Sequence, residues 1–174
     1  RRQRQMCIRD RGVLLRHLPE ARLVDISHDL LPFNDPETAY VVRNAVKHFP
    51  PGTFHIVLAN LFQHQPEHVL LVQHHQQYYC LADNGLITMI LEETPEVVAA
   101  LPLDRSVARL SLRMVDVMAR AIKQVAAGAA INTVGDTGVS IHVRTPPRPY
   151  TTNQYIEGQI ISIDHFENVI VNIT

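Results

Sequence analysis

Chemically capable side chains gather between His55 and His75, in a polar loop that separates two apolar runs. The loop contains no glycine and carries amide, imidazole and carboxylate groups at Asn60, Gln63, His64, Glu67 and His68. Loops that follow buried strands are common places for binding and catalysis. These residue types allow three uses: metal coordination, contact with a substrate, or connection alone.

The number of histidines favours metal coordination, because four of them lie between positions 64 and 75. His64 and His68 are four residues apart, as on one helix face, but the segment reads as loop and strand. On a strand, His74 and His75 point to opposite faces. A zinc site needs three or four converging ligands, and the chain has no HExxH motif and no paired cysteines. We therefore expect no metal here.

Composition excludes several classes of function. The seven glycines stand singly, so there is no glycine-rich phosphate loop and no GxSxG motif. A net charge of −1 gives no case for nucleic acid or an anionic membrane, and no apolar run approaches the ~20 residues of a membrane helix. Cys7 and Cys80 have no ligand or redox spacing, which suggests free thiols and a cytoplasmic protein.

Strand and helix patterns alternate through the middle of the chain. Short apolar runs predict strands at 22–27, 54–59, 68–73, 77–81 and 97–101. Amphipathic periodicity predicts helices from Asn34 or Asp35 to Phe49, over 86–92 and over 112–127. This order favours an α/β fold with a mixed sheet flanked by helices, over residues 12–140.

The two ends of the chain differ from its middle. Residues 1–11 hold five arginines and almost no apolar content, and we expect a non-native or disordered leader. Residues 141–153 have the composition of a linker, and 154–174 predict a hairpin that starts a separate β module. The last residues stop inside a predicted strand, so we expect a chain truncated at both ends.

Two polar clusters remain. In "VDISHDLLPFNDPE", helix capping explains Asn34, Asp35 and Glu37, but it does not explain Asp25, Ser27, His28 and Phe33. In "IDHFENVIVN", Asp164 and Asn168 fit a hairpin turn, because both residue types are poor strand formers.

The motifs "VDISHD…PF", "FPPGT.H", "DNGL" and "ID.F.N…NI" occur in this order along the chain. In order and spacing the sequence resembles the S-adenosylmethionine (SAM) hydroxide adenosyltransferases, relatives of the fluorinases and chlorinases. The resemblance implies an α/β SAM-binding domain, a C-terminal β-barrel domain and a homotrimer. It also implies SAM as substrate, no further cofactor, and displacement at the C5′ carbon by water or a halide.

The resemblance assigns binding roles by position. Phe33 falls where a family aromatic packs on the substrate, and Asp164 where an Asp holds the methionine amino group. Phe166 and Asn168 fall where the family's "FGN" meets the adenine, with Glu167 in place of the glycine. Gln63, in the polar loop, is a further candidate for substrate contact.

The family's water-activating Asp, Arg and His positions hold Asn60, Glu67 and Arg113 in this chain. Asn60 can hydrogen-bond a water molecule but cannot accept its proton, whereas Glu67 can act as a general base. Opposite charges at Glu67 and Arg113 suggest a replaced ion pair. Two functions stay open: a SAM-cleaving adenosyltransferase that uses water, or a non-catalytic protein of the same fold that binds SAM or adenosine. Halide transfer and a metal-dependent hydrolase are minor alternatives.

Overall fold

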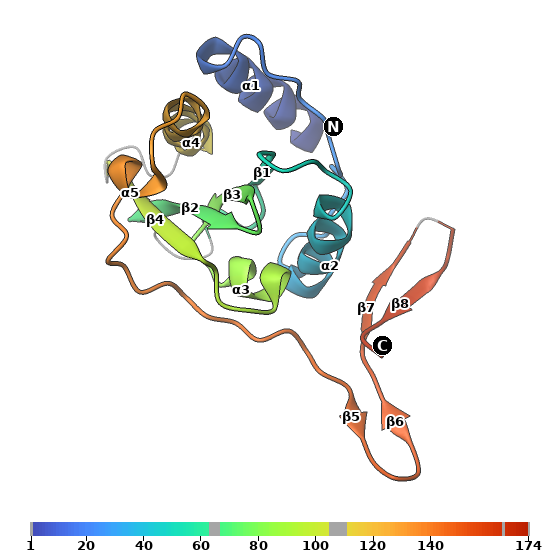
Figure 1. The fold of residues 1–174 in the computed structure, drawn as a ribbon. Coiled ribbons are helices and arrows are strands. Elements are labelled where there is room, and N and C mark those ends of the chain that lie inside the picture. The colour runs from blue at the N-terminus through green and yellow to red at the C-terminus, as the bar shows by residue number, and fades with distance from the viewer. Residues whose placement is uncertain (1, 63–66, 105–110, 165, 174) are drawn as a thin grey trace.

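Apolar runs of the chain build a four-stranded sheet with helices on both faces (Figure 1). The computed structural model describes residues 2–62, 67–104, 111–164 and 166–173. The strands are β1 (Phe54–Val57), β2 (His68–His74), β3 (Gln77–Ala82) and β4 (Val97–Pro102). The helices are α1 (Arg2–His17), α2 (Asp35–Val46), α3 (Leu86–Leu91), α4 (Ser111–Ala126) and the short α5 (Ile131–Val134).

The sheet is mixed, as the sequence predicts. Its strand order is β1-β3-β2-β4, with β1 parallel to β3 and the other two pairs antiparallel. Strands β2 and β3 form a tight hairpin, and helix α3 leads from β3 to β4. The carboxyl ends of β1 and β3 therefore lie at the same edge of the sheet, where polar loops follow both strands.

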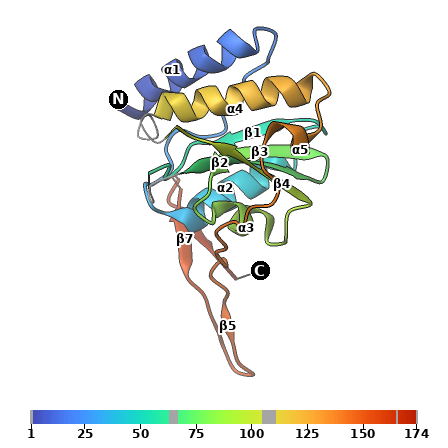
Figure 2. The same ribbon diagram turned by 90° about the vertical axis from the view of Figure 1, so that its left-hand side faces the viewer.

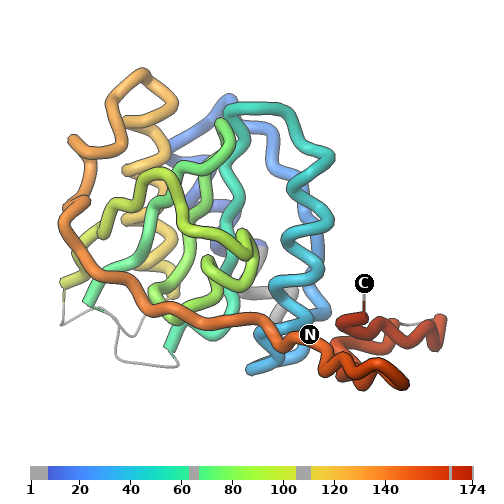
Figure 3. The backbone as a smooth tube through the Cα atoms, turned by 60° about the horizontal axis from the view of Figure 1, so that its bottom comes forward, coloured from blue at the N-terminus to red at the C-terminus, as the bar shows by residue number. Residues whose placement is uncertain are grey.

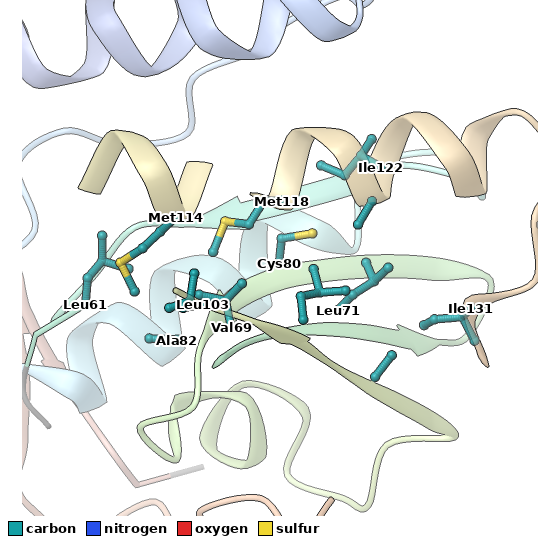
Figure 4. Close-up of a cluster of buried hydrophobic side chains, with 13 residues drawn as sticks. Leu61, Val69, Leu71, Cys80, Ala82, Leu103, Met114, Met118, Ile122 and Ile131 are labelled. Atoms are coloured by element: carbon teal, nitrogen blue, oxygen red, sulfur yellow. The ribbon is translucent and has the colours of Figure 1, made fainter. Parts of the chain in front are cut away.

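Successive side chains of β2 point to opposite faces of the sheet, and this divides the core into two layers. Val69 and Leu71 point toward α4 and pack in one cluster with Met114 and Met118 of that helix (Figure 4). Leu70 belongs to the other layer, which is formed with α2 and α3. Because both faces of β2 are covered, its four central residues are fully buried and read as a continuous apolar run.

Helix α4 is covered on two sides, with the sheet beneath it and α1 above it (Figure 2). Val115 and Ala119 pack against Leu14 of α1, while Met114 and Met118 pack against the sheet. The sequence predicts a single buried stripe that includes Val115 and Met118 but not Met114. The second covered side explains the difference, because it widens the buried surface of the helix.

Helix α1 begins at Arg2, within the segment that composition set apart as a leader. Asp10 and Leu14 are buried, and His17 Nε2 lies 2.8 Å from the Asp116 carboxylate of α4. Burial raises the pKa of the Asp10 carboxyl, against the lowering effect of Arg9. Residues 2–11 are therefore helical in this structure, while the leader and the division into domains stay predictions.

Residues 22–27 do not form the buried strand that their apolar run predicts. Leu23, Val24 and Ile26 are exposed, and the segment has no strand assignment. A strand needs a partner for its backbone groups. In the described part of the chain, β1 pairs only with β3, so 22–27 lacks a partner and its apolar side chains stay in solvent.

The chain after α5 runs in an extended path along α3 and then forms two small hairpins (Figure 3). These are β5 (Tyr150–Thr151) with β6 (Ile156–Glu157), and β7 (Ile160–Ile163) with β8 (Val169–Val171). The predicted late strands are thus confirmed. The described residues hold no closed barrel, and a larger β-barrel domain remains a prediction. Among the described helices, none is both long and apolar enough to cross a membrane.

The thiol of Cys80 is expected to resist alkylation in the folded protein. Cys80 is fully buried in β3, and burial raises the pKa of its thiol to about 12. Only the thiolate reacts, so a Cys7→Ser variant should react with iodoacetamide at neutral pH only when denaturant unfolds it. Mass spectrometry across a urea series measures this, and equal rates with and without urea would contradict the burial.

Candidate functional site

Asn60, a predicted site residue, forms hydrogen bonds to the loop that precedes α2 and to the first turn of that helix. It follows β1 in a left-handed conformation with φ of 50°. Its Oδ1 accepts a hydrogen bond from the Phe33 amide at 3.0 Å, and its Nδ2 donates to Asp35 Oδ1 at 2.6 Å. Arg144 completes the set through a bond to Asp35 Oδ2. We call Phe33, Asp35, Asn60 and Arg144 the Asn60 network.

The buried carboxylate of Asp35 is the centre of the Asn60 network. It lies in the first turn of α2, where the free N–H groups of a helix favour negative charge. The Arg144 guanidinium supplies a countercharge from the extended segment, at 36% side-chain exposure. Arg144 is fixed in turn by Thr88, whose Oγ lies 2.9 Å from its amide nitrogen and 2.8 Å from its carbonyl oxygen.

The "DNGL" motif supports this network from the side of β3. Asn84 Nδ2 donates long hydrogen bonds to the carbonyls of Ala59 (3.4 Å) and Asn60 (3.5 Å). Gly85 has φ of 85°, and a Cβ there would lie 2.5 Å from Cγ of Arg144. Any side chain at position 85 would therefore displace the arginine that pairs with Asp35.

Glu37 connects the start of α2 to the β7–β8 hairpin. Its carboxylate accepts hydrogen bonds from the Leu31 amide at 3.2 Å and from Ser162 Oγ at 2.5 Å. Asn34, the residue that caps α2, donates to the Ile161 carbonyl at 3.2 Å. The hairpin that carries the predicted adenine and methionine contacts is thereby anchored next to Phe33.

The hairpin turn itself uses Asp164 and Asn168, as their residue types predict. Asp164 Oδ1 accepts from the amides of Phe166 (2.8 Å) and Asn168 (2.9 Å), and its Oδ2 accepts from Asn168 Nδ2 at 2.9 Å. Glu167 occupies the left-handed position of the turn with φ of 66°. Phe166 is 73% exposed and Phe33 is 72% exposed.

Glu67 and Arg113 form no ion pair with each other in the part of the chain that the structure describes. Glu67 lines a hollow of about 510 Å³ with His68, Pro102 and Asp136. Arg113 is exposed in the first turn of α4. The predicted Gln63 and His64 lie outside the described residues. The structure therefore assembles Phe33, Asn60 and the hairpin, while a site that also includes Glu67 and Arg113 stays a prediction.

Sequence reasoning missed a second polar set beside this region. Asp83, the first residue of "DNGL", has a carboxylate only 7% exposed. Its oxygens lie 3.0 Å from His68 Nε2 and 3.3 Å from His142 Nδ1, and Oδ1 accepts from the His142 amide at 2.9 Å. The motif signalled a turn, but His142 and His68 are 59 and 15 residues away from Asp83, so no local pattern could show the contact.

Comparison with known proteins identifies the family of this chain. Residues 9–135 match the SAM hydroxide adenosyltransferase N-terminal domain. The chain belongs to this family. The chain is 30% identical over 83 residues to the (R)-S-adenosyl-L-methionine hydrolase of Methanocaldococcus jannaschii, a match that covers 47% of the chain and 31% of that relative.

Two crystal structures share the fold of this family member. One, an uncharacterized conserved protein from Thermotoga maritima, has a TM-score of 0.78 and 25% identity, and covers 95% of the chain. The other, a conserved hypothetical protein from Thermus thermophilus, has a TM-score of 0.64 and 21% identity over 94% of the chain. The chain spans 65% and 64% of the lengths of these two proteins.

Proposed function

We propose that this chain is the SAM-binding part of an enzyme that cleaves SAM with water, giving adenosine and methionine. Membership of the SAM hydroxide adenosyltransferase family is the observation that carries the proposal. The Asn60 network supports it, since it holds the backbone of Phe33, whose ring is exposed, beside a polar loop and an anchored hairpin. The protein acts as a homotrimer in its natural length, with SAM as substrate and no further cofactor.

The reaction breaks the bond between C5′ and the sulfonium sulfur as a water oxygen bonds to C5′. The electron pair of the broken bond stays on sulfur, which neutralises the sulfonium and releases methionine. Because the sulfonium is a good leaving group, the protein mainly aims the nucleophile and excludes bulk water. Asn60 orients the water and Glu67 takes its proton. Arg113 supplies a positive charge that holds an anion.

The binding roles follow the same proposal. Phe33 packs on the nucleoside, Phe166 and Asn168 contact the adenine, and Asp164 binds the methionine ammonium group. Gln63 contacts the substrate from the polar loop. The same Asp164 oxygens accept three hydrogen bonds within the turn.

A second function has its own support. The family's water-activating Asp, Arg and His positions hold Asn60, Glu67 and Arg113 in this chain, whereas the network at Phe33 is fully formed. A protein that binds SAM or adenosine without cleaving it would need only the second of these features. The binding function is therefore the alternative that the experiment must separate from hydrolysis.

The test incubates the protein in its natural length with SAM, with and without chloride, and quantifies adenosine and methionine by chromatography. Glu67→Ala should lower the rate of adenosine formation by roughly 10²–10⁴-fold, the usual contribution of a general base. Glu20→Ala, at an exposed glutamate before the 22–27 segment, is the matched control and should keep the full rate.

Equal rates for wild type and Glu67→Ala would contradict the role of Glu67. A chlorinated nucleoside that forms only with chloride would replace water by halide as the nucleophile. Saturable SAM binding by calorimetry without any product would reject hydrolysis and establish the binding function.

A further inference from the structure

Three potential metal ligands converge away from the Asn60 network, where the β2–β3 turn meets the loop after α3. They are His74 at the end of β2, His75 in the turn, and Glu93 after α3. His74 Nε2 lies 2.8 Å from Glu93 Oε1, and His75 Nε2 lies 3.9 Å from the same oxygen. One ligand atom from each residue lies within 4.8 Å of the other two.

Backbone geometry explains why two adjacent histidines share a face. The sequence predicts that His74 and His75 point to opposite sides of a strand, but β2 ends at His74. His75 and Gln76 form the two-residue turn, both with positive φ, at 48° and 61°. This conformation brings the His75 ring onto the His74 ring, with centroids 4.0 Å apart. The expectation of opposite faces is therefore wrong.

The three side chains differ in burial in a way that suits a metal at the surface. His74 is 5% exposed, and its Nδ1 has no hydrogen-bond partner in the described structure. The side chains of His75 and Glu93 are 72% and 54% exposed. An ion held by all three would have one buried wall and one open side, where a water molecule can complete its coordination.

The loop that carries Glu93 is held by neighbouring contacts. Arg43 of α2 donates to the carbonyls of Met89 (2.8 Å) and Ile90 (3.2 Å) and pairs with Glu92 at 2.6 Å. On the other side of the cluster, a Glu96 oxygen accepts from the His75 amide at 3.3 Å. The ligands thus project from a fixed turn and a fixed loop, and Glu93 and Glu96 add negative charge that attracts a cation.

We propose that His74, His75 and Glu93 bind a Zn²⁺ ion, with water as the fourth ligand. Two imidazoles and one carboxylate are ligands that zinc prefers, whereas Mg²⁺ and Ca²⁺ prefer sets made of oxygen alone. The ion ties the β2–β3 turn to the loop between α3 and β4. The site is separate from the proposed SAM site and does not depend on SAM cleavage.

The test titrates untagged, metal-free protein with Zn²⁺ by calorimetry and follows the melting temperature in parallel. We expect one equivalent to bind and the melting temperature to rise, because an ion that binds only the folded state stabilises it. His75→Gln and Glu93→Gln should each weaken binding by roughly tenfold or more. His48→Gln, at an exposed histidine just after α2, should bind as wild type does.

Both variants change exposed side chains, so their metal-free melting temperatures should stay near that of wild type and report an intact fold. Visible absorption of a Co²⁺ complex should show four-coordinate geometry in wild type and lose it in Glu93→Gln. The proposal is overturned if excess Zn²⁺ gives no heat and no melting shift. It is equally overturned if binding is unchanged in both variants, which would assign the ion to other histidines.

Discussion

Replacing Asp35 by alanine is expected to lower the free energy of unfolding by about 2–3 kcal/mol. The change removes the charged partner of Arg144 and the acceptor for the Asn60 side-chain amide. It also removes a negative charge from the first turn of α2. Because Arg144 keeps 36% of its side chain in solvent, water can solvate its free guanidinium, and the loss stays below that of a fully buried pair.

Urea unfolding measures this effect, with Asp29→Ala as the matched control. Asp29 is an exposed aspartate in the preceding loop, and its replacement should change stability by less than ~0.5 kcal/mol. A double-mutant cycle with Arg144→Ala isolates the interaction between the two charges. If Asp35→Ala and Asp29→Ala proved equally mild, the Asn60 network would not be a stabilising structure.

Leu70→Ala and Leu71→Ala should each cost roughly 2–5 kcal/mol of stability, although the two side chains point in opposite directions. Leu70 is fully buried against α2 and α3, and Leu71 is fully buried against α4. In a sheet with one solvent-facing side, only one of two adjacent leucines would have this effect. The prediction therefore tests the double cover of β2 directly.

Chemical denaturation of each variant gives the two values, and Leu31→Ala provides the comparison. The Leu31 side chain is largely exposed, so its truncation should be mild. A large loss at Leu71 together with a mild one at Leu70 would mean that α2 and α3 do not cover the sheet as described.

Local patterns were sufficient to predict most of the sheet and its helices. The apolar run of β2, the α4 periodicity and the capping by Asn34 each depend on residues close in sequence. The mixed character of the sheet comes from the tight β2–β3 hairpin, whose strands are antiparallel, together with the parallel pairing of β1 with β3. These features could be predicted because the same residues that form each element also determine how it packs.

The features that the sequence did not predict have a different cause, because they depend on distant partners or on backbone conformation. Residues 22–27 have strand-like side chains but no neighbouring strand to pair with in the described structure. A local sequence pattern cannot show whether such a neighbouring strand exists. Asp35 and Arg144 meet across 109 residues, and Arg144 lies in a segment whose composition suggests only a linker. His75 joins His74 because His75 and Gln76 both adopt positive φ, an uncommon conformation that the sequence did not reveal. Long-range pairing and backbone conformation thus decided the candidate sites.

The left-handed conformation of Phe33 has a consequence for the thermodynamics of ligand binding. A bulky residue at φ of 63° costs roughly 1–2 kcal/mol relative to an ordinary backbone, and the Asn60 side chain holds it there through the Phe33 amide. The backbone at Phe33 is thus held in its conformation before any ligand arrives. A ligand that stacks on this ring has only the side chain left to order, so less of its interaction energy is consumed in ordering the protein.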